Sequence, residues 1–133
     1  MKKLIKLIKE ARFVWVAGNG GSASTAEHFT CDLFSKGINV TCLNSNTSIM
    51  TMIGNDFGYR YVFSKQLDVY GYEDDLLITI SCSGTSPNIV EAKKTATKKG
   101  MVVYSFETFG SKRDYEKLED NHLKFCHQIK KLL

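Results

Sequence analysis

The 133-residue sequence has a single proline, no apolar run near the length of a membrane span, and no C-x-x-C pair among its four cysteines. A long proline-rich disordered segment, a membrane-spanning helix and a disulfide or zinc-finger scaffold are therefore not expected. The opening stretch, MKKLIKLIKEARF, carries charges throughout its apolar part and does not resemble a secretory signal. These features predict one globular domain over residues 1–133, located in the cytoplasm.

The net charge of +4 is small, and the lysines are distributed along the chain rather than gathered in one segment. Their spacing within residues 2–9 and 93–99 is typical of the solvated faces of helices. We therefore expect neither nucleic acid nor a membrane surface as a partner. A chain of this size buries only about two-thirds of the surface its unfolded form exposes, which favours assembly into an oligomer.

Short apolar segments alternate with amphipathic ones along the chain. Strands are predicted over residues 13–17, 39–43, 75–80 and 101–106, and helices over 2–10, 22–36, 46–53, 59–70, 87–99 and 111–132. Such alternation is typical of α/β proteins with a parallel sheet and helices on both of its faces. We predict a three-layer, flavodoxin-like fold with a sheet of four strands, or five, in the order 2-1-3-4. In that order the first and third strands are neighbours, and ligands bind beside their carboxyl ends.

Three of the ten glycines lie in one turn, residues 17–24 (AGNGGSAS), directly after the first predicted strand. A strand, a glycine turn and a helix start present backbone N–H groups at the positive end of a helix dipole, which suits an anion. The turn lacks the glycine spacing of a dinucleotide site and the lysine of a nucleotide-triphosphate loop. Taken alone, it is equally compatible with a tight turn that binds nothing.

A second turn of this kind, residues 81–88 (SCSGTSPN), follows the third predicted strand and opens another helix. Its hydroxyl side chains surround Gly84. Because the predicted strand order places the two turns side by side, a shared anion site is a more specific prediction than either turn supports alone. Neither turn contains lysine or arginine, so neutral donors and helix dipoles would hold the anion. This arrangement suits a small phosphorylated sugar better than a triphosphate.

Three segments, GNGGSAS with the EHF that follows, NTSIMTMIGNDFGY and ISCSGTSPNIVEA, resemble the sugar isomerase (SIS) domain family. The likeness extends over about residues 14–103. It is strongest to the branch that converts sedoheptulose 7-phosphate to D-glycero-D-manno-heptose 7-phosphate on the way to lipopolysaccharide. The resemblance implies an aldose–ketose isomerase that works through an enediol, assembled as a homotetramer or dimer. Several members of the family bind zinc, so zinc is the cofactor that the resemblance implies.

The resemblance also implies roles for individual residues. The substrate contacts would be Asn19, Gly20, Gly21, Ser22, Asp56, Ser81, Cys82, Ser83, Ser86 and Glu116. Asp32 would be the catalytic base and His127 the acid. A metal would be held by His28, Asp32, Glu119 and His127. The spacing agrees with this set, because residues four apart share one face of a helix. A His–Asp pair at that spacing is nevertheless more often a surface pair than a metal site.

The chain departs from the family pattern at several positions. Asp32 stands where the family has glutamate, Glu119 where it has glutamine, and Cys82 where it has threonine. The segment between the fourth strand and the last helix is also short. These departures keep an alternative open, namely a non-catalytic SIS module that binds a phosphosugar or a protein. We expect His122 at the surface or behind the site, and Cys82 and Cys126 as packing residues rather than nucleophiles.

Overall fold

Four parallel strands form the middle layer of the protein. The structure is a computed structural model that describes residues 1–106 and 114–133. Its strands are β1 (Val14–Gly18), β2 (Val40–Cys42), β3 (Leu76–Ile80) and β4 (Val102–Ser105). Their order in the sheet is β2-β1-β3-β4, as predicted. Because β1 pairs with β3 from Val14 opposite Leu76 to Gly18 opposite Ile80, the turns that follow these two strands begin side by side.

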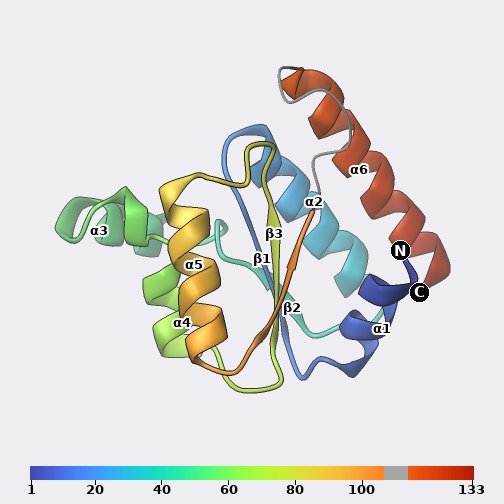
Figure 1. The fold of residues 1–133 in the computed structure, drawn as a ribbon, viewed down its shortest axis with the longest axis horizontal. Helices are drawn as coiled ribbons and strands as arrows, with labels where there is room; N and C mark the ends of the chain where they lie inside the picture. The colour runs from blue at the N-terminus through green and yellow to red at the C-terminus, as the bar shows by residue number, and fades with distance from the viewer. Residues whose placement is uncertain (107–113) are drawn as a thin grey trace.

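Helices cover both faces of the sheet (Figure 1). One face carries α1 (Lys2–Glu10), α2 (Gly21–Phe34) and α6 (Tyr115–Leu132). The other carries α3 (Thr47–Asp56), the 3-10 helix η1 (Tyr59–Tyr61), α4 (Ser64–Tyr70) and α5 (Pro87–Lys98). The predicted three-layer architecture is therefore confirmed.

Side chains of the central strands alternate between two separate cores. Val14 and Val16 belong to the core under α1, α2 and α6, whereas Trp15 and Ala17 belong to the core under α3, α4 and α5. Successive residues of a strand point to opposite faces, so a strand buried on both sides is apolar at every position. This explains the continuous apolar run that precedes the first glycine turn.

Several element boundaries differ from the sequence prediction. The segment 59–70, predicted as one helix, is divided into η1 and α4, and the residues between them, Val62 and Phe63, are fully buried. The last helix begins at Tyr115, where the Asp114 carboxylate accepts a hydrogen bond from the Lys117 N–H at 3.1 Å. The predicted start of that helix, at residues 111–113, lies outside the described residues.

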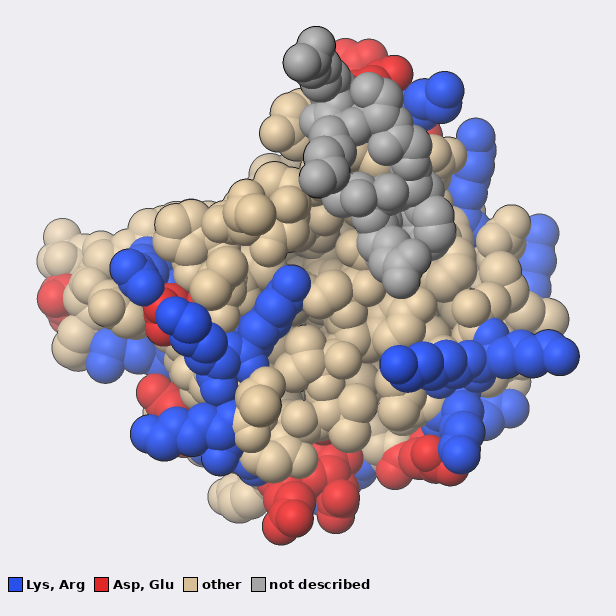
Figure 2. Space-filling view, in the orientation of Figure 1, with Lys and Arg blue, Asp and Glu red and all other residues tan. Residues whose placement is uncertain are grey.

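Charge is dispersed over the surface that Figure 2 shows. Lysine and arginine side chains lie there in separate groups, mostly around the rim, with acidic side chains between them. Within the described parts of the chain, no helix combines the length and apolar character that a membrane crossing requires.

Candidate active site

The turns after β1 and β3 enclose one cavity of about 210 Å³. It is lined by Asn19, Ser22, Ser81, Cys82, Ser83, Ser86, Tyr115 and Glu119. Six of these eight residues come from the two turns singled out in the sequence. Tyr115 and Glu119 come from the first turns of α6, which lies beside α2 (Figure 1). The predicted juxtaposition of the two turns is therefore present in the structure.

Both turns end in a helix start that faces this cavity. Gly20 precedes α2 with φ of 56°, and Gly84 lies in the second turn with φ of 68°, a backbone region that favours glycine. Ser86 precedes α5, whose first residue is Pro87. The N–H groups of Ser22 and Ala23 donate locally to the Asn19 and Gly20 carbonyls, each at 3.0 Å, and that of Ile89 donates to Asn88 Oδ1 at 2.9 Å. The N–H groups of Gly21 and Asn88 have no partner among the described residues, so one donor at each helix start, at the positive end of a dipole, is available to an anion.

The serine hydroxyls of the second turn are held by their own backbone. Ser81 Oγ accepts a hydrogen bond from the Gly84 N–H at 3.0 Å, and Ser83 Oγ accepts one from the Thr85 N–H at 3.3 Å. Since each hydroxyl acts as an acceptor in these bonds, its own hydrogen remains available for donation to a bound group. The turn is thus arranged as a set of neutral donors.

A pair of asparagines connects the two turns. The amide nitrogen of Asn19 donates to the amide oxygen of Asn88 at 2.8 Å, and the reverse bond is also 2.8 Å long. Tyr59 donates its hydroxyl hydrogen to Asn19 at 3.3 Å. Asn88 and Tyr59 were not among the predicted site residues. Asn88 belongs to the second turn, but it gains its partner, Asn19, only because the fold brings the two turns together.

The Glu119 carboxylate lies against the first residue of α2. A Cβ atom added to Gly21 would be 2.3 Å from either carboxylate oxygen of Glu119. The positive end of the α2 dipole favours a carboxylate at this place. Glu119 is the one charged residue among those that line the cavity. It therefore occupies part of the space in which an incoming anion would meet the start of α2.

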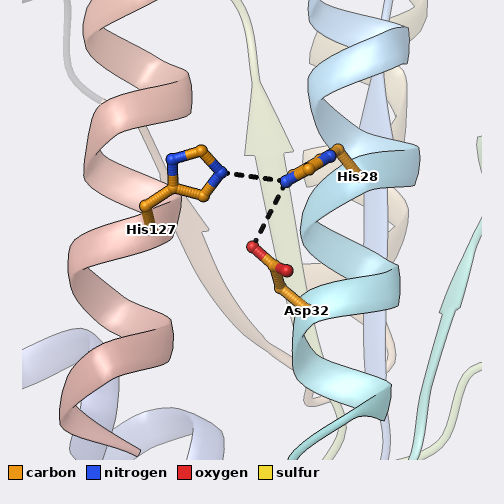
Figure 3. A group of neighbouring side chains, drawn as sticks. All are labelled: His28, Asp32 and His127. Carbon is orange, nitrogen blue, oxygen red and sulfur yellow. Dashed lines mark hydrogen bonds and ion pairs between the residues drawn. The ribbon is translucent and has the colours of Figure 1, made fainter.

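A second group of functional side chains lies further along α2 and α6. His28, Asp32 and His127 each offer a ligand atom, and these three atoms lie within 4.8 Å of one another. His28 Nε2 is 3.0 Å from His127 Nε2 and 3.5 Å from Asp32 Oδ2, so the three side chains point toward one another across the two helices (Figure 3). Three of the four predicted metal ligands are thus together, and Glu119 is the one that lies apart.

Asp32 is almost completely buried, with only 3% of its surface exposed. Its Oδ1 accepts a hydrogen bond from Lys130 Nζ at 2.5 Å. Its Oδ2 has no hydrogen-bond partner among the described residues and faces the histidines. Lys130 was not predicted, because a lysine in the last turn of a basic helix has the same sequence signature as a solvated side chain.

The chemistry of this group fits a divalent metal ion. Two imidazole nitrogens and a carboxylate oxygen converge there. The buried Asp32 Oδ2 has no hydrogen-bond partner among the described residues, and a bound metal would supply the missing interaction. Such nitrogen and oxygen donors are those that zinc and similar metals accept.

Other predicted residues lie outside both groups. Asp56 ends α3, where it is exposed and accepts a hydrogen bond from the Asn55 amide at 2.9 Å, and it does not line the cavity. Glu116 is exposed in the first turn of α6, and Tyr115 lines the cavity in its place. The substrate contacts of Asp56 and Glu116 stay predictions. His122 is fully buried, with its ring centroid 5.6 Å from that of Phe106, so it lies behind the site rather than at the surface.

The two cysteines near the site lie in environments that raise the pKa of their thiols. Burial, and then the charge of Glu119, raise the pKa of Cys82, whose Sγ is 3.9 Å from Ser22 Oγ. Burial, and then the charge of Asp32, raise the pKa of Cys126. A thiolate is the nucleophilic form of cysteine, so both environments support packing roles.

A larger cavity of about 640 Å³ lies between the strands β1 and β2 and the helices α3 and α4. It is lined by Phe13, Trp15, Thr41, Cys42, Ser45, Asn46, Thr47, Ser48, Ile49, Gln66 and Tyr70. None of these residues is a histidine or a charged residue. The larger cavity therefore offers no acid–base pair, whereas the smaller one lies on the same two helices as His28, Asp32 and His127.

Comparisons of the sequence and of the structure with known proteins match the same group of proteins. A family model described as the SIS domain matches residues 1–107. The phosphoheptose isomerase of Campylobacter concisus is 34% identical over 92% of this chain, and that of Burkholderia pseudomallei is 43% identical over 77%. The solved structure of the phosphoheptose isomerase GmhA from Neisseria gonorrhoeae covers 98% of this chain with a TM-score of 0.88 and 28% identity.

These relatives are longer than the present chain. The alignment spans 75% of the Campylobacter concisus protein and 55% of the Burkholderia pseudomallei protein. In the structural comparison it covers 80% of the Neisseria gonorrhoeae chain. The chain thus spans from about half to three-quarters of the length of these curated relatives.

Proposed function

The chain belongs to the SIS domain family, and we propose that it is a phosphosugar isomerase that interconverts a ketose phosphate and an aldose phosphate. The pair we propose is sedoheptulose 7-phosphate and D-glycero-D-manno-heptose 7-phosphate. The observation that carries the proposal is that the cavity between the two turns is bordered by α2 and α6, the same two helices that bring His28, Asp32 and His127 together. The turns are suited to bind a phosphate, and the His–Asp–His group is suited to transfer protons.

In this proposal the phosphate is bound between the two turns. The starts of α2 and α5 supply backbone N–H donors, and Ser81 and Ser83 supply hydroxyl hydrogens. Binding the non-reacting phosphate fixes the sugar relative to the catalytic groups, which lowers the entropic part of the barrier. The Asn19–Asn88 pair keeps the two turns at a fixed separation.

Proton transfer is assigned to Asp32 and His127. Asp32 takes a proton from the carbon beside the carbonyl, and the electron pair of that C–H bond forms the double bond of the enediol. The carbonyl π electrons move to oxygen, which takes a proton from His127. Return of a proton to the neighbouring carbon, with loss of one from the other oxygen, completes the exchange of ketose and aldose. Atoms and electrons balance without any co-reactant.

The residues around Asp32 also fit zinc, and we propose His28, Asp32 and His127 as its ligands. Bound zinc would supply a Lewis acid that polarises the carbonyl oxygen. Glu119 is the predicted fourth ligand and would have to leave Gly21 to reach the other three.

The distance between the phosphate-binding turns and the His–Asp–His group favours a substrate with a long carbon chain. Ser22 and His28 are six residues apart on α2, which corresponds to about 9 Å along the helix. A triose phosphate is too short to place its phosphate at one group and its carbonyl at the other. A seven-carbon ketose carries the two at opposite ends of an extended chain.

We also propose that the protein is a cytoplasmic homo-oligomer, a tetramer or a dimer. Support comes from large apolar side chains that are exposed on and after α3, among them Met52, Phe57 and Tyr59. All four cysteines are free thiols, in keeping with a reducing compartment.

The proposal is tested by incubating the purified chain with sedoheptulose 7-phosphate in D₂O and following the aldose phosphate by mass spectrometry. We expect an aldose product that carries solvent deuterium on carbon. Asp32→Asn should lower kcat by about a hundredfold or more, whereas Asp120→Asn, an exposed carboxylate on α6, should leave it unchanged. Ser83→Ala should raise KM by about tenfold.

A non-catalytic binding module is the second candidate, favoured by the ion pair that Lys130 forms with the proposed base. It predicts that the chain binds the sugar phosphate without forming an aldose. Absence of both binding and turnover would overturn both candidates.

A further inference from the structure

We propose that Lys130 is a built-in counter-cation of Asp32 that a divalent metal must displace, so that Lys130 sets how tightly this site binds metal. The inference deepens the proposed function, because it concerns the metal proposed for the same group of residues. Lys130 is a positioning residue in this role, since it acts through Asp32.

The geometry gives the two oxygens of Asp32 different partners. Oδ1 accepts the 2.5 Å hydrogen bond from Lys130, and Oδ2 faces His28 at 3.5 Å. Lys130 follows His127 by three residues on α6, so both side chains leave the same face of that helix toward α2. The ammonium group and the predicted metal ligands therefore meet at a single carboxylate.

Because the Asp32 carboxylate is buried, its charge must be balanced by a cation, either the Lys130 ammonium or a metal. The side chain of Asp32 is 4% exposed, and a carboxylate that deep requires a compensating positive charge. An ammonium bonded to Oδ1 would lie within a few ångströms of a metal on Oδ2, where like charges repel strongly because little water separates them. The carboxylate therefore binds one cation, the ammonium or the metal, more favourably than it binds the two together.

Lys130 is able to leave. Its side chain is 40% exposed, and a lysine has a long flexible stem that can carry its charge back into water. Binding of a metal therefore exchanges one cation for another at Asp32, and the cost of removing the ammonium is subtracted from the metal affinity.

A merely structural role makes a different prediction. If the ion pair only fastened α6 to α2, its removal would lower the stability of the fold and leave the intrinsic metal affinity unchanged or reduced. The proposed role requires metal affinity to rise when the lysine charge is removed. The two roles thus differ in the direction of one measurable quantity.

The test is a Zn²⁺ titration of the full chain by isothermal calorimetry with competing chelator. Lys130→Gln should lower the zinc Kd by about tenfold or more, because a nearby positive charge is gone. Lys131→Gln removes the same charge from the next, exposed residue and should leave Kd within about twofold. Lys130→Arg keeps the charge and should stay close to wild type. An unchanged or higher Kd for Lys130→Gln, or no zinc binding by any of the variants, would overturn the proposal.

A second measurement uses only the wild-type chain, so its result does not depend on whether a variant folds. Lysine side chains are labelled with an amine-reactive reagent, with and without saturating Zn²⁺, and each site is quantified by mass spectrometry. Labelling of Lys130 should increase with zinc while that of Lys131 stays the same. Equal labelling of Lys130 in both conditions contradicts the displacement. Neither readout uses a sugar, so failure of the isomerase assay and failure of this inference are separate results.

Discussion

At the scale of single residues, Glu119 has the strongest influence on what the cavity between the turns can bind. Its carboxylate lies against Gly21, at the place where the start of α2 offers its N–H groups. A phosphate is attracted by those N–H groups and by the helix dipole, but it is repelled by a carboxylate in the same small cavity. In the free protein Glu119 therefore competes with the anion.

Replacement of this charge should strengthen anion binding. We predict that Glu119→Gln lowers the Kd for inorganic phosphate by about three- to tenfold, measured by isothermal calorimetry. Asp120→Asn is the matched control, because Asp120 carries the same charge on the next residue of α6, is exposed and does not line the cavity. Equal effects of the two substitutions, or weaker binding by Glu119→Gln, would show that Glu119 does not oppose the anion.

The sequence predicts some residues of the cavity and leaves others unmarked. The hydroxyl-rich turns were predicted from their pattern, and the resemblance to the SIS family implied Ser22, Ser81, Ser83 and Ser86 within them. All four line the cavity. The sequence around Lys130 and Tyr115 has no pattern that indicates their roles. Their roles depend on which side of α6 meets α2 and on where a flexible side chain finds a charge, and these are properties of packing rather than of spacing.

At the scale of elements, the closeness of β1 to the first turn of α2 determines the shape of the anion-binding turn. A Cβ on Gly18 would be 2.3 Å from the backbone oxygen of Ser22, so any side chain there would push the strand and the helix apart. This contact explains the glycine at the end of β1 without any need for a special φ angle.

The prediction is that Gly18→Ala lowers the free energy of unfolding by about 1–3 kcal/mol, measured by urea denaturation. Gly54→Ala is the control, because Gly54 lies within α3 and its nearest neighbour, Val62 Cγ1, is 4.0 Å from the added Cβ. Alanine is the better helix former, so this control should gain about 1 kcal/mol. A neutral Gly18→Ala would mean that the turn is looser than the structure indicates.

The elements were predicted more reliably than the residues. The strands followed from apolar runs, a pattern that burial on both faces imposes. Their order followed from the alternation of strands and helices, which favours the flavodoxin-like topology. The division of 59–70 into η1 and α4 was not predicted, because a short 3-10 turn beside an α-helix has a similar apolar spacing.

At the scale of the whole molecule, α3 stands at the edge of its layer, where Figure 1 shows it projecting from the side opposite α6. Within α3 only Ile53 is buried. Met52 is 48% exposed and Phe57, which follows α3, is 51% exposed. Apolar side chains gathered in this way mark interaction sites more often than scattered ones do.

We therefore predict that the chain sediments as a dimer or tetramer and that Phe57→Glu shifts it toward the monomer in analytical ultracentrifugation. Phe34→Glu is the control, because Phe34 is 74% exposed at the end of α2, away from α3. A wild-type monomer at micromolar concentration would refute the proposed assembly.

The most direct test of the central claim is a crystal structure of the chain soaked with sedoheptulose 7-phosphate. We predict the phosphate between Ser22 and Ser83, with the carbonyl end of the sugar toward His28 and His127. A phosphate bound instead in the larger cavity beside Trp15 and Tyr70, or a sugar directed away from the two histidines, would contradict the account.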